Sequence, residues 1–176
     1  MISDLDLQQK LDRIQLLLLD VDGVLTDGRI IYHDNGDETK VFHVRDGMGI
    51  RLLLLSGIRV GIATGRSSPA LFHRCRNLGI TLIFDGLKEK IPVLERIFQE
   101  TGVSTDQIAY VGDDLMDLAI MKRVGVAFAV SDAHEMIIQH ADWVTSCNGG
   151  QGAVREVCEF ILKKKGLWNR IIQRFY

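Results

Sequence analysis

Four consecutive leucines, Leu16–Leu19, constrain the fold of this 176-residue chain more than any other feature. An apolar run without polar alternation is typical of a strand that is covered on both of its faces. Similar short runs occupy residues 60–63, 80–84, 108–111 and 126–130, and groups with helical spacing lie between them. These groups are Ile50, Leu53 and Leu54; Leu71, Cys75 and Leu78; Ile91, Leu94, Ile97 and Phe98; and Leu118, Met121 and Val124. Strands that alternate with helices predict an α/β fold in which helices cover a parallel sheet.

One stretch breaks this alternation. Residues 29–33 and 40–44 flank the sequence Asp34-Asn35-Gly36-Asp37. An Asn-Gly pair between two such arms predicts a β-hairpin, and we place this insertion at about residues 28–45. No linker or repeat divides the chain, and its length is near that of one domain. We therefore expect a single domain over residues 1–176.

Composition and charge exclude several classes of protein. The formal net charge is −2, whereas nucleic-acid-binding domains usually carry a strongly basic face. No apolar stretch approaches the roughly 20 residues that a membrane span needs. The three cysteines form no Cys-x-x-Cys pair, and residues 1–13 contain no apolar core of a signal peptide. We expect a cytoplasmic protein with no membrane span and no nucleic-acid partner.

Polar side chains follow three of the predicted strands. Asp20 and Asp22 come after the first strand, Thr64 after the next, and Asp113 and Asp114 after the run at 108–111. In open α/β sheets ligands bind outside the carboxyl ends of the strands, so these side chains should meet. Carboxylates brought together repel unless a cation neutralises them, and hard oxygen ligands favour Mg²⁺. Asp114 and Thr64 also fit as helix caps. The capping explanation is weaker for Asp20 and Asp22, because neither aspartate of such a pair is needed to cap a turn from a strand to a loop.

The Asp-x-Asp pair at positions 20 and 22 suits phosphoryl transfer. A carboxylate held by a metal can attack a phosphoryl group and form an aspartyl-phosphate. A second carboxylate two residues on can protonate the leaving alkoxide and then deprotonate the water that hydrolyses the intermediate. A Thr hydroxyl, backbone N–H groups, a Lys and Mg²⁺ would supply the positive charge that the phosphoryl oxygens need.

Four parts of the chain resemble the four motifs of the haloacid dehalogenase (HAD) superfamily. They are residues 20–28 (DVDGVLTDG), residues 63–66 (ATGR), Lys90, and residues 112–117 (GDDLMD). The resemblance implies a HAD-like, doubly wound parallel sheet flanked by helices. Lys88 competes with Lys90 for the third motif, although the spacing favours Lys90.

The same resemblance implies a role for each motif residue. Asp20 is the nucleophile and Asp22 the general acid and base, while Thr64 and Lys90 hold the phosphoryl group. The implied Mg²⁺ ligands are Asp20, the backbone carbonyl of Asp22, and Asp113, with Asp114 and Asp117 in support.

Two further segments are similar to the 3-deoxy-D-manno-octulosonate 8-phosphate (KDO 8-phosphate) phosphatases. They are residues 42–51 (FHVRDGMGIR) and 149–157 (GGQGAVREV), and the resemblance covers roughly residues 14–166. It implies hydrolysis of KDO 8-phosphate to KDO and phosphate, in lipopolysaccharide precursor biosynthesis, by a capless homotetramer whose neighbouring subunits close each site. Only about 20 residues separate Thr26 from Gly47, too few for a cap domain.

The implied substrate contacts include arginines, whose forked donors suit carboxylate and phosphate oxygens. Arg74 fits equally well as a charge on a solvated helix face. The full set of implied substrate-binding residues is His43, Val44, Arg45, Asp46, Gly47, Arg51, Arg66 and Arg74.

Two features depart from the family pattern. Gln151 stands where an Arg is common, which removes one possible charge contact. The tail, about residues 167–176, is basic and aromatic, and Leu167, Ile171, Ile172 and Phe175 share one helical stripe. This stripe predicts a packed or partner-contacting tail helix, with membrane-surface binding as the alternative.

Two other functions stay open. A phosphatase for a related nine-carbon sugar-acid phosphate uses the same chemistry, and one polar substitution in a pocket can redirect specificity. A phospho-accepting, receiver-like signalling domain also combines clustered Asp, a Thr, a Lys and Mg²⁺ on a parallel sheet. Such a domain has no use for Asp22 and should hold its phosphate for long periods. A catalytically silent binding module has no support in the intact motif set.

Overall fold

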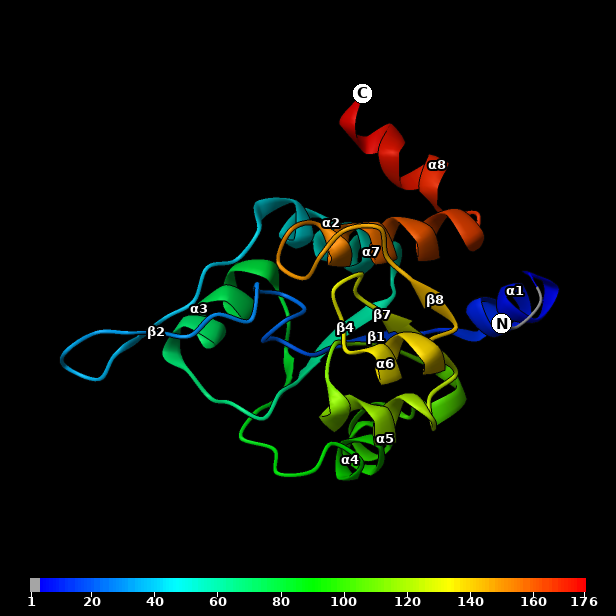
Figure 1. The fold of residues 1–176 in the computed structure, drawn as a ribbon. Helices are drawn as coiled ribbons and strands as arrows, with labels where there is room; N and C mark the ends of the chain where they lie inside the picture. The colour runs from blue at the N-terminus through cyan, green and yellow to red at the C-terminus, as the bar shows by residue number, and fades with distance from the viewer. Residues whose placement is uncertain (1–3) are drawn as a thin grey trace.

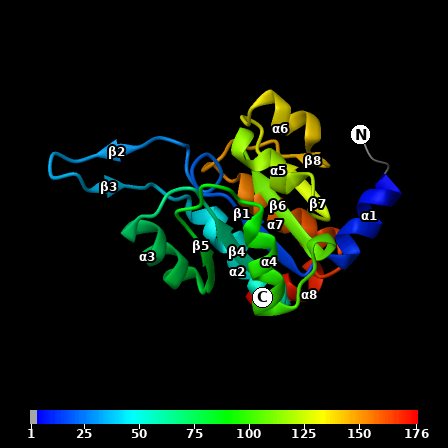
Figure 2. The ribbon, with the colours of Figure 1, turned by 90° about the horizontal axis from the view of Figure 1, so that it is seen from below.

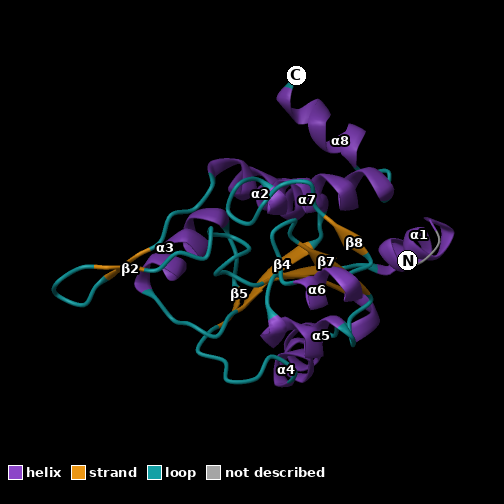
Figure 3. Cartoon of the chain, in the orientation of Figure 1, coloured by secondary structure: helices purple, strands orange, loops and turns teal. Residues whose placement is uncertain are grey.

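The computed structural model describes residues 4–176 and contains a six-stranded parallel sheet with helices on both faces (Figures 1 and 3). The strands are β1 (Leu16–Leu19), β2 (Ile31–Tyr32), β3 (Glu38–Thr39), β4 (Arg59–Ala63), β5 (Leu82–Phe84), β6 (Ile108–Gly112), β7 (Val126–Ala129) and β8 (Trp143–Val144). The α-helices are α1 (Asp4–Arg13), α2 (Val44–Ser56), α3 (Pro69–Leu78), α4 (Pro92–Thr101), α5 (Leu118–Met121), α6 (Glu135–His140), α7 (Ala153–Lys164) and α8 (Trp168–Ile172). Short 3-10 helices cover Thr105–Gln107, Leu115–Asp117 and Gln173–Phe175.

The four leucines of β1 explain why this sheet is covered twice. All four are fully buried, and successive side chains of a strand point to opposite faces. Leu17 and Leu19 join the apolar cluster beneath α1, α2, α3 and α7. Leu16 and Leu18 join the second cluster, beneath α4, α5 and α6. The predicted parallel sheet with helices on both faces is therefore confirmed.

The strand order places three strand ends side by side. The order is β5-β4-β1-β6-β7-β8, so β1 lies between β4 and β6 and pairs in parallel with both. The chain moves outward from β1 to one side through β4 and to the other side through β6. Loops diverge at such a switch point and leave room for a ligand between them.

The predicted hairpin is confirmed, but its second strand was misplaced. β2 and β3 pair antiparallel around a turn in which Gly36 has a φ of +87°. The second strand is Glu38–Thr39 and not residues 40–44, because α2 already begins at Val44. Figure 2 shows the hairpin reaching away from the helical layers.

Several elements escaped the sequence analysis, for different reasons. β8 is only two residues long, and α1 contributes only Leu7 and Leu11 to the core. The tail is helical as expected, yet its stripe divides: Ile171 is buried, whereas Phe175 is exposed. No helix within residues 4–176 is long and apolar enough to cross a membrane.

Candidate active site

One polar cleft of about 320 Å³ lies at the carboxyl ends of β1, β4 and β6. The lining residues come from loops that are far apart in the chain but start at neighbouring strands. They are Asp20, Asp22, Gly28, Thr64, Gly65, Arg66, Lys90, Asp113, Asp114, Met116 and Asp117. The structure therefore brings every residue predicted to be catalytic or to surround the metal into one cleft.

The loop after β1 turns sharply and lies against the loop after β6. The backbone N–H groups of Val24, Leu25 and Thr26 all point to the carbonyl of Val21, at 2.8–3.2 Å. Gly23 has a φ of +85°, and a Cβ there would lie 2.0 Å from a carboxylate oxygen of Asp113. Only glycine meets both conditions, because it tolerates positive φ and has no side chain.

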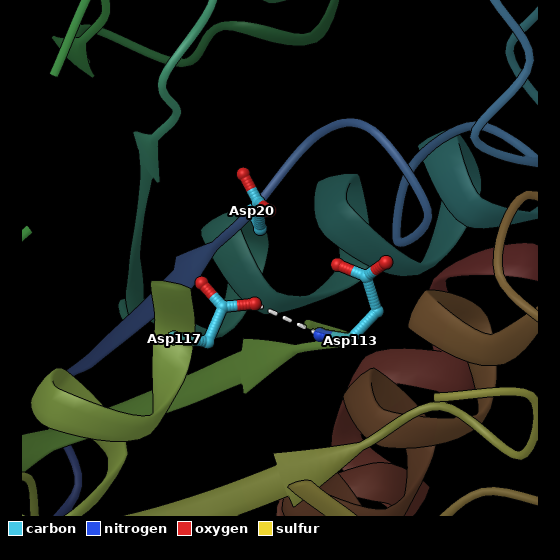
Figure 4. A group of neighbouring side chains, drawn as sticks. All are labelled: Asp20, Asp113 and Asp117. Atoms are coloured by element: carbon cyan, nitrogen blue, oxygen red, sulfur yellow. Dashed lines mark hydrogen bonds between the residues drawn. The ribbon is translucent and has the colours of Figure 1, made fainter. Parts of the chain in front are cut away.

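A buried lysine connects the two aspartates on either side of it. Lys90 Nζ lies 3.0 Å from Asp20 Oδ1 and 2.6 Å from Asp117 Oδ1, and donates to Tyr110 Oη at 3.0 Å. The other oxygen of Asp117 accepts from the backbone N–H of Asp113 at 2.9 Å and of Asp114 at 3.3 Å (Figure 4). Asp117 thus uses both oxygens to hold Lys90 and the loop after β6.

Two carboxylates of the cleft, those of Asp20 and Asp113, have too little positive charge nearby to offset the cost of burying their ionised forms. Burial raises the pKa of Asp20 to about 6, although Lys90 opposes the shift. Burial, followed by the negative charges of Asp20 and Asp117, raises the pKa of Asp113 to about 8. Asp113 Oδ1 is buried without a hydrogen-bond partner among residues 4–176. A cation between Asp20 and Asp113 would correct both deficits.

The geometry of these oxygens fits a metal ion. One oxygen each from Asp20, Asp113 and Asp117 lies within 4.8 Å of the others (Figure 4). Because the oxygens of Asp117 already accept four hydrogen bonds, Asp20 and Asp113 are the residues with oxygens left to bind the ion. Hard carboxylate oxygens, with positions left for water and substrate, are the ligands that Mg²⁺ prefers.

Known proteins share this arrangement and much of the sequence. A model of haloacid dehalogenase-like hydrolases matches residues 82–157. The 3-deoxy-D-manno-octulosonate 8-phosphate phosphatase KdsC of Escherichia coli (strain B / BL21-DE3) is 47% identical over 161 residues, which are 92% of this chain and 86% of the relative. The chain belongs to the KDO 8-phosphate phosphatase family.

Solved structures of this family superpose closely. The phosphatase from Yersinia pestis has a TM-score of 0.92 and 42% identity, over 96% of this chain and 90% of its own. The phosphatase from Moraxella catarrhalis, solved with magnesium, phosphate and KDO, has a TM-score of 0.95 and 40% identity, over 99% of this chain and 100% of its own. The expectation of a HAD-like fold is thereby confirmed, and the Moraxella catarrhalis structure contains the metal ion, magnesium, that the sequence predicts for this site.

Apart from Arg66, the residues predicted to bind substrate lie outside the carboxylate cleft. Residues 43–47 form the start of α2, where Arg74 donates to the carbonyl of His43 at 3.1 Å. Asp46 is buried and accepts from the backbone N–H of Arg155 at 2.7 Å and of Gly152 at 3.3 Å. Its carboxylate therefore caps the N-terminus of α7.

The remaining positions of this group differ in exposure, and Gly47 is buried. Val44 and Arg45 are exposed, and Gly47 packs so tightly that a Cβ there would lie 2.3 Å from a guanidinium nitrogen of Arg74. Arg51 lines a separate cleft of about 520 Å³ that also includes Phe175 of the tail. Within one subunit, substrate binding by these residues stays a prediction.

Two motif residues have local roles that the sequence left open. Asp114 accepts from the backbone N–H of Leu115 at 2.8 Å and caps the 3-10 helix Leu115–Asp117, which was the structural alternative for it. Thr64 is buried, and its hydroxyl accepts from the backbone N–H of Arg66 at 3.4 Å. The Thr64 hydroxyl hydrogen remains free to bond a ligand in the cleft.

Sequence reasoning missed three residues of the site. Tyr110 looked like one more apolar position of β6, yet its hydroxyl donates to Asp117 at 2.6 Å. Glu38 and Lys40 belong to the hairpin and reach Arg66 and Asp22. Their spacing of two, which puts both side chains on one face of the hairpin arm, was the available signal.

The raised pKa values predict how magnesium binding depends on pH. The folded protein holds protons on Asp20 up to about pH 6 and on Asp113 up to about pH 8, whereas the unfolded chain releases them near 3.8. The metal-free protein should therefore lose stability as pH rises through these values. Since Mg²⁺ displaces the same protons, its apparent Kd should fall about tenfold per pH unit between roughly pH 6 and 8.

Calorimetric Mg²⁺ titrations at pH 6, 7 and 8, with melting curves of the metal-free protein, measure both effects. A flat Kd across this range would contradict the assignment of Asp113 as a buried, proton-holding ligand.

Proposed function

We propose that this chain is a Mg²⁺-dependent phosphatase that hydrolyses KDO 8-phosphate to KDO and phosphate through an aspartyl-phosphate on Asp20. The observation that carries the proposal is the cleft, in which Asp20 forms an ion pair with buried Lys90 and lies near Asp113, whose Oδ1 has no hydrogen-bond partner among the described residues. The family supplies the substrate, because its relatives carry the name KDO 8-phosphate phosphatase and one structure contains KDO and phosphate.

The first half-reaction uses Asp20 and Asp22. Lys90 holds Asp20 Oδ1, which leaves Oδ2 free to attack the phosphorus. Asp22 donates its proton to the sugar oxygen as the phosphorus–oxygen bond to the sugar breaks. The Thr64 hydroxyl and the Lys90 ammonium group bond the phosphoryl oxygens and stabilise their charge. Bound Mg²⁺ would add its own positive charge to the same oxygens.

In the second half-reaction Asp22 is a base. It takes a proton from water, whose oxygen attacks the phosphorus, and the bond from phosphorus to Asp20 breaks. Inorganic phosphate leaves, and both aspartates return to their starting states. A general acid or base of this kind typically accelerates a step by about 10²–10⁴-fold.

Asp22 also separates this function from the signalling alternative. A receiver-like domain needs a phosphorylated aspartate that persists, and it has no use for a proton-transfer group beside it. Here Asp22 lines the cleft together with Asp20 and Arg66. The competing nine-carbon sugar-acid phosphate differs only in the part of the substrate that lies beyond the phosphoryl group.

The proposed protein is a single catalytic domain that assembles as a homotetramer and works in the cytoplasm, with its product used in lipopolysaccharide precursor synthesis. The exposed apolar side chains of the hairpin support assembly, because contiguous exposed apolar surface often marks a protein contact. These side chains are Ile30, Ile31, Tyr32 and Val41, and exposed Val44 follows them as the first residue of α2. A neighbouring subunit on this surface would also lie close to the start of α2, where the predicted substrate contacts are.

The test is phosphate release from a panel of sugar-acid phosphates, with Mg²⁺ and again with EDTA. We expect Mg²⁺-dependent turnover that is strongest on KDO 8-phosphate, and a tetramer mass by light scattering. Faster turnover on a nine-carbon substrate would reassign the substrate. A stable phosphorylated Asp20 without turnover would revive the signalling function.

A further inference from the structure

Lys40 is a buried cation that the reaction above does not yet use. It follows β3 in the hairpin, and its side chain is only 2% exposed. Its ammonium group donates to Asp22 Oδ1 and lies 2.9 Å from Glu38 Oε1. A hairpin whose first strand is exposed thus buries the Lys40 side chain against Asp22, the proposed general acid of the site. Burying an ammonium group costs free energy, and its two carboxylate partners offset that cost. The burial of Lys40 beside Asp22 therefore suggests a role for Lys40 in the reaction.

The two oxygens of Asp22 have different surroundings. Oδ1 accepts the hydrogen bond from Lys40. Oδ2 is buried and has no hydrogen-bond partner in the described part of the chain, and Arg66 Nε lies 3.6 Å from it. One oxygen is therefore held by the protein, and the other is available to exchange a proton with a ligand in the cleft.

Glu38 and Arg66 in turn fix the position of Lys40. Glu38 forms an ion pair with Lys40 through Oε1, and its Oε2 accepts from the guanidinium of Arg66. Arg66 also donates to Tyr32 Oη at 3.0 Å, which ties it to the other strand of the hairpin. Glu38 of the hairpin thereby holds Lys40, and Arg66, which follows β4 of the sheet, lies beside Asp22. A base that is oriented by a third group is the recurrent arrangement of proton-transfer sites.

We propose that Lys40 is a positioning residue for Asp22: it holds Oδ1 so that Oδ2 faces the bond between phosphorus and the sugar oxygen. The inference rests on the proposed function, in which Asp22 gives its proton to that oxygen as the bond breaks. Glu38 keeps Lys40 in place. In this capless protein the hairpin thus supplies Lys40, the residue that orients the proton-transfer group.

The leaving group distinguishes positioning of an acid from other roles. A sugar alkoxide must be protonated as it leaves, whereas p-nitrophenolate is stable near neutral pH and needs no proton. Lys40→Met should lower kcat on KDO 8-phosphate by about ten- to a hundredfold, with KM changed less than about threefold. The burst rate constant for p-nitrophenolate release from p-nitrophenyl phosphate, which reports phosphorylation of Asp20, should change less than about threefold.

Two further variants serve as references for Lys40→Met. Asp22→Asn should show the same selective loss at larger size, about 10²–10⁴-fold on the sugar phosphate. Lys10→Met removes a similar ion pair, 2.8 Å long, between α1 and Asp142 at the far side of the molecule from the hairpin (Figures 1 and 2). It should leave both substrates unaffected. If Lys40→Met does not fold, Lys40→Arg, which keeps the charge but displaces it, should shift the ratio of the two rates in the same direction.

Several outcomes would overturn the proposal. Equal losses on both substrates would show that Lys40 serves the phosphoryl group, and a raised KM with unchanged kcat would make it a sugar-acid ligand. An unchanged ratio in both Lys40 variants would leave Asp22 without an orienting partner. If the wild type hydrolyses another alkyl phosphate instead of KDO 8-phosphate, only the proposed substrate fails, and the ratio is measured on that phosphate. A wild type inactive on every phosphate would overturn both proposals.

Discussion

Replacing Asp20 by Asn should reduce phosphate release by about 10⁴-fold or more while the protein stays folded. The amide cannot form the aspartyl-phosphate, and Asp117, which also lies beside Lys90, already accepts four hydrogen bonds. Because burial raises the pKa of Asp20 to about 6, its charge is disfavoured in the folded protein at neutral pH. Loss of that charge should leave the melting temperature of the metal-free variant equal to or above that of the wild type.

The matched control for this variant is Asp27→Asn in the same loop. Asp27 is exposed, and its carboxylate contacts only Arg29 among the contacts recorded for residues 4–176, through the backbone N–H at 3.1 Å and the side chain at 3.7 Å. Turnover by Asp27→Asn should equal that of the wild type. Substantial phosphate release by Asp20→Asn, measured with Mg²⁺ at saturating substrate, would require a different nucleophile.

The second large effect is expected from Lys90→Met. Lys90 is buried and pairs with Asp20 and Asp117, so its removal leaves two carboxylates in the interior without their cation. Breaking a buried pair in this way costs about 3–5 kcal/mol. Denaturant unfolding should show this loss of stability, and turnover should fall to background because the phosphoryl group also loses its ammonium ligand.

A second substitution tests the cause of this loss. Lys90→Met combined with Asp117→Asn should recover part of the stability, because the unpaired carboxylate is removed while an amide oxygen still accepts from the backbone N–H of Asp113. Lys88→Met, two residues upstream and exposed, is the control and should be neutral. If Lys90→Met leaves the free energy of unfolding unchanged, another group must neutralise the carboxylates of Asp20 and Asp117.

Local sequence was sufficient for the parts of the fold that depend on near neighbours. The unalternated leucines of β1 predicted a strand buried on both faces, and all four are fully buried. The Asn35-Gly36 pair predicted the hairpin, because positive φ at a tight turn favours such residues. The motif residues at the ends of β1, β4 and β6 were predicted to meet, and all of them line the cleft.

The sequence was insufficient to predict features that depend on contacts between two distant segments. The second arm of the hairpin was placed two residues late, because the register of a hairpin depends on its turn and on where the next helix begins. Substrate binding by Asp46 stays a prediction, and only the structure reveals that its carboxylate accepts from the N-terminus of α7, more than a hundred positions later. No local pattern reveals which distant N–H groups will need an acceptor.

The sequence by itself determined the sheet and its two covered faces, because apolar periodicity is a local property, and strand-end chemistry was enough to predict which carboxylates meet in the cleft. Only the tertiary structure decided how those carboxylates are held. Asp117 uses both oxygens to support Lys90 and the loop after β6, Tyr110 completes that network from within β6, and Lys40 reaches Asp22 from the hairpin. Each of these contacts joins residues brought together by the packing of separate loops, and a buried charge takes its partner from whatever that packing places beside it.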